Sequence, residues 1–100
     1  MAGGLAVDTI NGHNIAGGFI GTGQTWQNVI GSRSRGVTYT NTTGKPIMVV
    51  VHDNAGPAGL LVVGGVTLNR LSNYLWYTAI VPNNTTYSFS GSFTIWTELR

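Results

Sequence analysis

The sequence contains no cysteine among its 100 residues. Disulfide bonds and thiolate metal sites are therefore excluded, although small domains that must stay folded outside a cell often depend on disulfides. A small domain without such cross-links commonly gains stability by oligomerisation. The missing cysteine thus favours a protein whose copies cover part of one another.

Charged residues are also scarce, at 8% of the chain, against roughly a quarter in typical soluble proteins. The three carboxylates, Asp8, Asp53 and Glu98, are too few and too dispersed for a glycosidase pair or a calcium site. The basic residues are scattered, and the one close pair, Arg33 and Arg35, lies among Ser and Gly, which predicts a flexible loop. Nucleic-acid binding needs a clustered basic patch, so we expect no nucleic-acid partner.

No apolar run approaches the ~20 residues of a membrane span, so membrane insertion is not expected. The first residues lack a basic region followed by an apolar stretch, and we expect no signal peptide. His52 and Asp53 are the one His–carboxylate neighbour pair, but adjacent residues of a strand point to opposite faces. No serine lies in a nucleophile elbow, and His13 and His52 are more simply solvated or structural than metal ligands. We therefore predict no enzymatic activity, no metal and no cofactor.

Glycine is abundant, and seven glycines lie within residues 1–23. We predict that residues 1–23 form a connector or an extended arm, and that residues 24–100 form one β-domain. Short segments separated by turn residues predict an all-β fold, a small antiparallel β-sandwich of the jelly-roll kind. The expected strands are 25–30, 36–40, 46–52, 60–63, 66–69, 75–81, 87–90 and 93–99.

Turn chemistry supports this division. Residues 41–45, Asn-Thr-Thr-Gly-Lys, predict a hairpin loop in which Gly44 adopts a positive φ. Gly64 and Gly65 predict a two-residue hairpin. Residues 47–51 are apolar on both faces of their strand, which requires a second covering layer. A second sheet plus the N-terminal arm could supply it, or a neighbouring protomer, which we favour.

The segment 93–99 alternates in polarity. We expect Phe93, Ile95 and Leu99 to face the core, while Trp96 and Glu98 face outward toward a partner. The candidate residues of a trimer interface are Met48, Val50 and Trp96.

Residues 73–77 hold three aromatic rings beside an asparagine. Aromatic faces with polar neighbours suit both sugar rings and protein interfaces. The candidate ligand-binding residues are Asn54, Asn73, Tyr74, Trp76 and Tyr77, with Tyr74 or Trp76 stacking on a sugar and the asparagines supplying hydrogen bonds. The alternative is that most of these rings pack in the core or between protomers.

Several stretches resemble one known family in the expected order. They are residues 23–29 (Gly-Gln-Thr-Trp-Gln-Asn-Val), 32–33 (Ser-Arg), 37–49 (Val-Thr-Tyr-Thr-Asn-Thr-Thr-Gly-Lys-Pro-Ile-Met-Val), 79–83 (Ala-Ile-Val-Pro-Asn), 86–88 (Thr-Tyr-Ser) and 96–100 (Trp-Thr-Glu-Leu-Arg). This pattern is similar to the C-terminal tip domain of tailed-bacteriophage tail fibres and tailspikes. The resemblance implies a homotrimeric β-sandwich at the distal end of a fibre on the virion, used in host recognition. The segment between residues 50 and 77 matches least well.

Two functions follow as expectations. One is a receptor-binding tip that attaches the virion to host surface polysaccharide or lipopolysaccharide without cleaving it. The other is a structural cap that trimerises a longer fibre or spike. A third hypothesis, after the tip and the cap, is a secreted lectin-like module unrelated to phage.

Overall fold

The computed structural model describes residues 19–53, 58–70 and 74–100. Most of the predicted connector, including its Gly-rich part, lies outside these residues. The elements are β2 (Trp26–Asn28), the 3₁₀ turn η1 (Ile30–Ser32), β3 (Tyr39–Thr40), β4 (Ile47–Asp53), β5 (Leu61–Val63), β6 (Val66–Thr67), β7 (Trp76–Val81), β8 (Thr86–Phe89) and β9 (Phe93–Leu99). Each expected strand is present, in most cases shorter than predicted, which confirms the all-β class.

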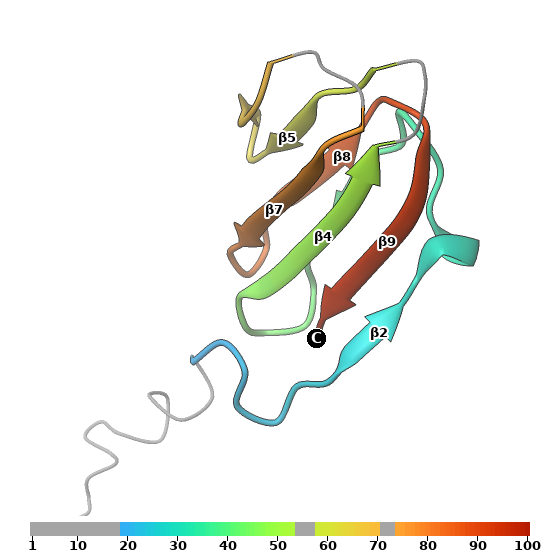
Figure 1. The fold of residues 1–100 in the computed structure, drawn as a ribbon. Helices are drawn as coiled ribbons and strands as arrows, with labels where there is room; N and C mark the ends of the chain where they lie inside the picture. Colours follow the sequence, from blue (N-terminus) through green and yellow to red (C-terminus); the bar gives the residue numbers. More distant parts are fainter. Residues whose placement is uncertain (1–18, 54–57, 71–73) are drawn as a thin grey trace, which may run out of the picture.

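The strands form two antiparallel four-stranded sheets (Figure 1). One sheet has the order β2-β9-β4-β7 and the other has the order β3-β8-β5-β6. Side chains from both sheets meet in a single apolar core, for example Tyr77 of β7 against Phe89 of β8, whose ring centroids are 5.4 Å apart. The inward residues of β4, Ile47, Val49 and Val51, are fully buried in this core.

Most connections cross from one sheet to the other. The segment 41–46 joins β3 of one sheet to β4 of the other, so the expectation of a hairpin between them is wrong. Buried Asn41 forms the corner: its amide nitrogen donates to the carbonyls of Lys45 at 2.7 Å and Val81 at 2.9 Å. Its side-chain oxygen accepts from the backbone of Thr43, an Asx turn that competes with strand pairing. Gly44 has the positive φ that was expected.

The turn between β5 and β6 is the hairpin that the sequence predicts. Val63 pairs with Val66, and Gly64 and Gly65 have φ values of 59° and 81°. Positive φ at both central residues is the requirement of a type I′ turn, whose twist matches that of the flanking strands.

The inward and outward faces of β9 differ from the expectation. Ile95 pairs with His52, whereas Phe93 pairs with Asp53, so Thr94 is an extra residue, a β-bulge. Because one added residue exchanges the two faces of a strand, Phe93 packs inward, but Ile95 and Leu99 lie on the outer face and Trp96 and Glu98 point into the core. The prediction that Trp96 and Glu98 face a partner is therefore wrong.

Candidate interaction surface

The side of the sheet β2-β9-β4-β7 that points away from the core is here called the outer face. Strand register places the residues of this face in three rows. They are Trp26, Leu99, Met48 and Ile80; then Asn28, Thr97, Val50 and Thr78; then Ile95, His52 and Trp76.

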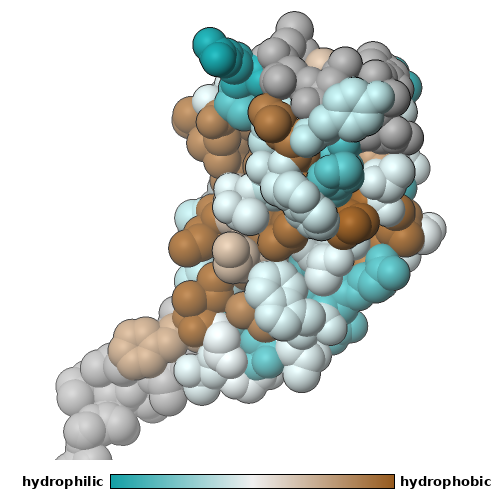
Figure 2. All heavy atoms as spheres, viewed as in Figure 1, coloured by the Kyte–Doolittle hydropathy of each residue, from teal (hydrophilic) through white to brown (hydrophobic). Residues whose placement is uncertain are grey.

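The outer face is apolar at several positions and carries no Asp, Glu, Lys or Arg in these rows. Trp76, Ile80 and Trp26 are 59%, 57% and 53% exposed. Figure 2, seen from the same side as Figure 1, shows hydrophobic residues in several groups, separated by residues of intermediate hydropathy. Exposed apolar groups gathered on one uncovered sheet face are consistent with an interaction site.

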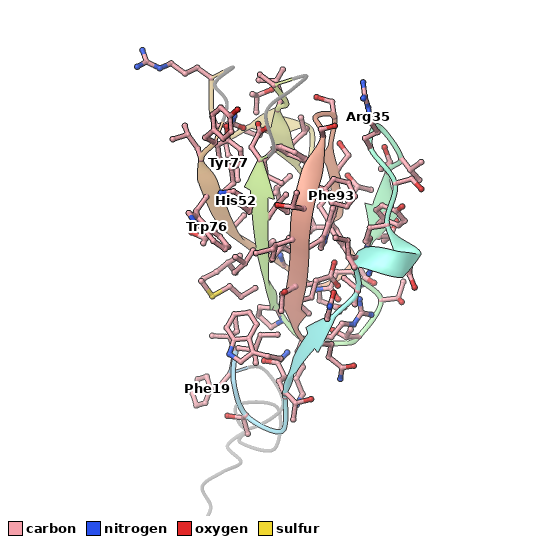
Figure 3. The ribbon with its side chains drawn as sticks, turned by 45° about the vertical axis from the view of Figure 1, so that its right-hand side comes forward. Phe19, Arg35, His52, Trp76, Tyr77 and Phe93 are labelled. Atoms are coloured by element: carbon pink, nitrogen blue, oxygen red, sulfur yellow. The ribbon has the colours of Figure 1, made fainter. Side chains whose placement is uncertain are left out.

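Trp76 is the centre of an aromatic–polar group at one end of the outer face. Its ring lies 4.5 Å from the ring of His52, centroid to centroid, with a 50° angle between the planes. His52 Nδ1 lies 3.1 Å from the Thr94 hydroxyl, a hydrogen bond whose direction depends on the imidazole tautomer. Trp76 and His52 lie side by side in Figure 3, while Phe93 points to the opposite side of the sheet. The bulge residue Thr94 thus joins His52 in supporting an exposed indole.

The predicted ligand residues separate into three groups. Trp76 and Tyr74 are exposed, and Tyr74 has a φ of 61°, outside the strand conformation. Tyr77, also predicted as a ligand residue, is only 7% exposed and packs against Phe89 in the core, so it is not available to a ligand. Asn54 and Asn73 lie outside the described residues.

The predicted interface residues also divide. Met48 and Val50 lie on the outer face, half-buried by their neighbours in the sheet. Trp96 is fully buried within the single chain. Its ring packs edge-on against the Phe93 ring, with the centroids 5.0 Å apart, and its indole N–H donates to Glu98. Assigning Trp96 to a subunit interface is therefore wrong, because the bulge at Thr94 turns it inward.

A buried ionic network that the sequence patterns did not predict surrounds Glu98, whose side chain is completely buried. Arg33 donates two hydrogen bonds to the carboxylate, at 3.1 and 3.0 Å, and Arg100 donates one at 2.7 Å. The Tyr87 hydroxyl and the Trp96 indole N–H each donate at 3.0 Å. A buried charge persists only when it is paired and hydrogen-bonded, and five donors meet that requirement here.

The network connects parts of the chain that are far apart in sequence. Arg33 follows directly after η1, Tyr87 lies in β8 of the second sheet, and Glu98 lies in β9. The guanidinium of Arg33 also lies 4.6 Å from the centroid of the Tyr39 ring, a cation–π contact. The loop expected at Arg33 and Arg35 is present between η1 and β3, but these contacts anchor the Arg33 side chain in it. The available signal was that Trp96, Glu98 and Arg100 share a strand face, with a lone carboxylate between a ring and a cation.

These contacts set the protonation of the network. Burial opposes ionisation of Glu98, but the hydrogen bonds from Arg33 and Arg100 outweigh it and hold the pKa below its ordinary value of 4.5. Burial lowers the pKa of Arg33, but its bonds to Glu98 outweigh this and raise that pKa overall. Burial, together with the negative charge of Glu98, raises the pKa of Tyr87 above 10.0. At neutral pH the Glu98 carboxylate and the Arg33 guanidinium are therefore charged, and the Tyr87 hydroxyl is neutral.

A pH dependence of stability follows from the lowered pKa of Glu98. The unfolded chain takes up the proton first, so the contribution of Glu98 to the free energy of unfolding is fully present above pH 4.5 and is lost as the pH falls through the lower folded-state pKa. Urea unfolding followed between pH 7 and pH 2 measures this loss. Glu98→Gln removes the titrating group, so its profile is expected to be flatter than that of the unchanged protein. Parallel profiles would contradict the assignment.

Asp53 and His52 lie on opposite faces of β4, as their adjacency predicts. Asp53 is buried, and its carboxylate accepts a hydrogen bond from the backbone of Gly59 at 3.3 Å. Burial and the nearby Asp53 charge raise the pKa of Tyr77. Asp53 therefore belongs to the packing around Tyr77, and His52 belongs to the outer face.

Among the described residues, no three His, Asp or Glu side chains gather as a metal site would require, and no pocket opens on their surface. Within the same part of the chain, no helix has the length and apolar character needed to cross a membrane. No family model matches the chain, and no curated protein or solved structure does so either.

Proposed function

We propose that this chain is the receptor-binding tip domain of a bacteriophage tail fibre, carried on the virion as a homotrimer. It attaches to host surface polysaccharide or lipopolysaccharide and does not cleave it. The observation that carries the proposal is the exposed Trp76 indole, held against His52 beside the Thr94 hydroxyl on an uncharged face. An aromatic platform bordered by hydrogen-bonding groups matches a sugar ring, which has apolar faces and hydroxyl edges.

The architecture supports the same proposal. The strand orders β2-β9-β4-β7 and β3-β8-β5-β6, with connections that cross between the sheets, support a jelly roll built from two Greek keys as the fold of this domain. β9 is paired on both sides, with β2 and β4, so this last strand is held firmly in its sheet. A rigid scaffold of this type suits a domain that presents a surface at the end of a fibre.

In this proposal the sugar stacks on the ring face of Trp76 that His52 does not cover. Thr78, the next outward residue of β7, is exposed and offers a hydroxyl on the same side. His52 offers its second ring nitrogen, since Nδ1 is engaged with Thr94. The groups beside Trp76 include no Asp, Glu, Lys or Arg, so recognition here depends on stacking and hydrogen bonds.

The test is binding of the full chain to purified lipopolysaccharides and capsular polysaccharides on a glycan array, followed by titration calorimetry on the best binder. Trp76→Ala is expected to weaken the affinity at least about tenfold, a loss of roughly 1.4 kcal/mol. Trp26→Ala is the matched control, because Trp26 is a similarly exposed indole of the same face at its opposite edge. Equal affinities for Trp76→Ala and the unchanged protein, with normal folding, would refute the role of Trp76.

A second function, a structural trimerisation cap, is favoured by a different observation. Met48, Val50 and Ile80 form an apolar patch on the outer face that no other described part of the chain covers. Burial of such a face against copies of itself is the usual way in which an oligomer gains stability. A trimer in solution that binds none of the glycans would support the cap over the tip.

A further inference from the structure

Strand β7 lies at the end of its sheet, and one of its edges has no neighbouring strand among the described residues (Figure 1). The backbone N–H of Asp53 donates to the Leu75 carbonyl at 2.8 Å, in the same register that pairs β4 with β7. In an antiparallel pair, hydrogen-bonded and non-hydrogen-bonded positions alternate. The backbone groups of Tyr77 and Ala79 therefore point toward β4, and those of Trp76, Thr78 and Ile80 point toward the free edge.

The free edge of β7 lacks the usual protection against pairing. Natural edge strands are kept apart by charged side chains, proline, bulges or very short length. β7 has six residues, none of them charged or proline, and its register with β4 is regular. The other edge strands of the two sheets, β2, β3 and β6, are only three, two and two residues long. β7 is thus the long unprotected edge of the described fold.

We propose that β7 pairs with β7 of a second copy of this chain, antiparallel and about a two-fold axis at Thr78. In this register Thr78 lies opposite Thr78 of the second copy, and Trp76 lies opposite Ile80 of the second copy. Each of these pairs occupies hydrogen-bonded positions, so the free N–H and C=O groups of Trp76, Thr78 and Ile80 are all satisfied. The β2-β9-β4-β7 sheets of the two copies then join into one continuous sheet.

The side chains fit this register on both faces. On the outer face, an exposed aromatic meets a β-branched residue twice and threonine meets threonine once, and both kinds of pair are favourable across strands. On the inner face, Tyr77 lies opposite Ala79 of the second copy, so a large side chain meets a small one. A strand whose free edge is complementary to itself under two-fold rotation fits a second copy better than an unrelated peptide.

The neighbouring registers are less suitable. A shift of two residues in one direction places Pro82, which has no N–H, opposite Trp76. The same shift in the other direction places Tyr74, whose φ is 61°, opposite Ile80, and that residue is not extended. A shift of one residue mismatches the hydrogen-bonding positions and the faces of the two strands. The register centred on Thr78 is therefore the one that uses every free group of β7.

This inference goes beyond the proposed function and does not depend on it. A two-fold contact at β7 differs from the three-fold contact of a trimeric fibre, and the smallest closed assembly with both contacts would be a hexamer. Self-association and glycan binding are measured separately, so either proposal can fail alone.

The direct test is amide hydrogen exchange of the full chain, followed residue by residue by NMR in a dilution series. Pairing at β7 predicts that the amides of Trp76, Thr78 and Ile80 are protected at high protein concentration and lose protection on dilution. Amides of Tyr77 and Ala79, which point toward β4, are expected to stay protected throughout. Exchange at Trp76, Thr78 and Ile80 that is fast and independent of concentration would overturn the proposal.

Sedimentation velocity of two variants provides a second measurement. Thr78→Lys places like charges opposite each other at the axis, and Thr78→Pro removes the central N–H at a position where an edge strand tolerates proline. Both are expected to raise the dissociation constant of the dimer at least about tenfold. Thr67→Lys, at an exposed position of edge strand β6, is the matched control and is expected to leave association unchanged.

Thr97→Lys separates edge pairing from stacking of two outer faces, because Thr97 lies on that face in β9, away from the free edge. Loss of association in Thr97→Lys but not in Thr78→Pro would overturn edge pairing and indicate stacked faces, because the proline removes an edge N–H without adding charge to the outer face. A monomer at all concentrations, or an assembly whose size neither Thr78 variant reduces, would also overturn it.

Discussion

Replacement of Glu98 by Gln is expected to lower the free energy of unfolding by about 3 kcal/mol, close to a hundredfold in the ratio of folded to unfolded protein. The carboxylate is completely buried and accepts hydrogen bonds from Arg33 and Arg100. Without its charge, the guanidinium of Arg33, itself only 11% exposed, stays in the protein interior without a counter-ion. An amide also turns an N–H donor toward groups that are donors themselves, so part of the hydrogen bonding is lost as well.

Urea unfolding of the full chain measures this change, with the m-value used to confirm that the transition remains comparable. Arg35→Gln is the control, because Arg35 is an exposed cation close to Arg33 in the sequence and forms no ion pair among the described residues. Its effect is expected to be within about 0.5 kcal/mol. A loss below about 1 kcal/mol for Glu98→Gln would mean that the network contributes no more than an ordinary surface pair.

Replacement of Asn41 by Ala is expected to lower the free energy of unfolding by about 2–3 kcal/mol. The side-chain amide of Asn41 donates to the buried carbonyl of Val81, and its oxygen accepts from the backbone of Thr43. Alanine leaves these backbone groups unsatisfied at the corner where the chain passes from β3 to β4. The Asn41 N–H also donates to the Thr85 carbonyl, and the Asn41 carbonyl accepts from the Asn84 N–H. Removal of the Asn41 side chain is therefore expected to loosen both the 41–46 crossing and the 82–85 crossing between the sheets.

Asn83→Ala is the matched control for this experiment. Asn83 also accepts a hydrogen bond from a backbone N–H, that of Gly44 at 3.0 Å, but the contact is exposed, and water can replace it. Its loss is expected to cost less than about 1 kcal/mol. Thermal or urea unfolding of both variants provides the comparison, and equal losses in the two would show that burial of Asn41 has no special role.

The positions of the strands and tight turns could be predicted because they depend on neighbours in the sequence. Gly64 and Gly65 permit a turn that few other residue pairs allow, and the expected β5–β6 hairpin is present. The alternation of Tyr87 and Phe89 likewise predicts their common inward face, and both are buried. The apolar Met48 and Val50 indicated a strand with two apolar faces that both need a covering layer, and its outer face lacks one within the described chain.

The candidate site was less predictable, because its parts come from different strands. Trp76 was expected to be exposed and is, whereas its neighbour Tyr77 was expected at the site and is in the core. No local pattern placed His52 and Thr94 beside Trp76, since those contacts arise from the register of β7, β4 and β9.

The sequence by itself determined the all-β class, the turn positions and the scarcity of charge, since each depends on residue type and local spacing. Only the tertiary structure decided which face of β9 is inside, because the bulge at Thr94 opposes Asp53 of another strand and reverses the alternation. It also decided that Arg33 and Tyr87 meet Glu98, at separations of 65 and 11 residues. A buried carboxylate needs several donors at once, and only the packing of two sheets brings such distant donors to one point.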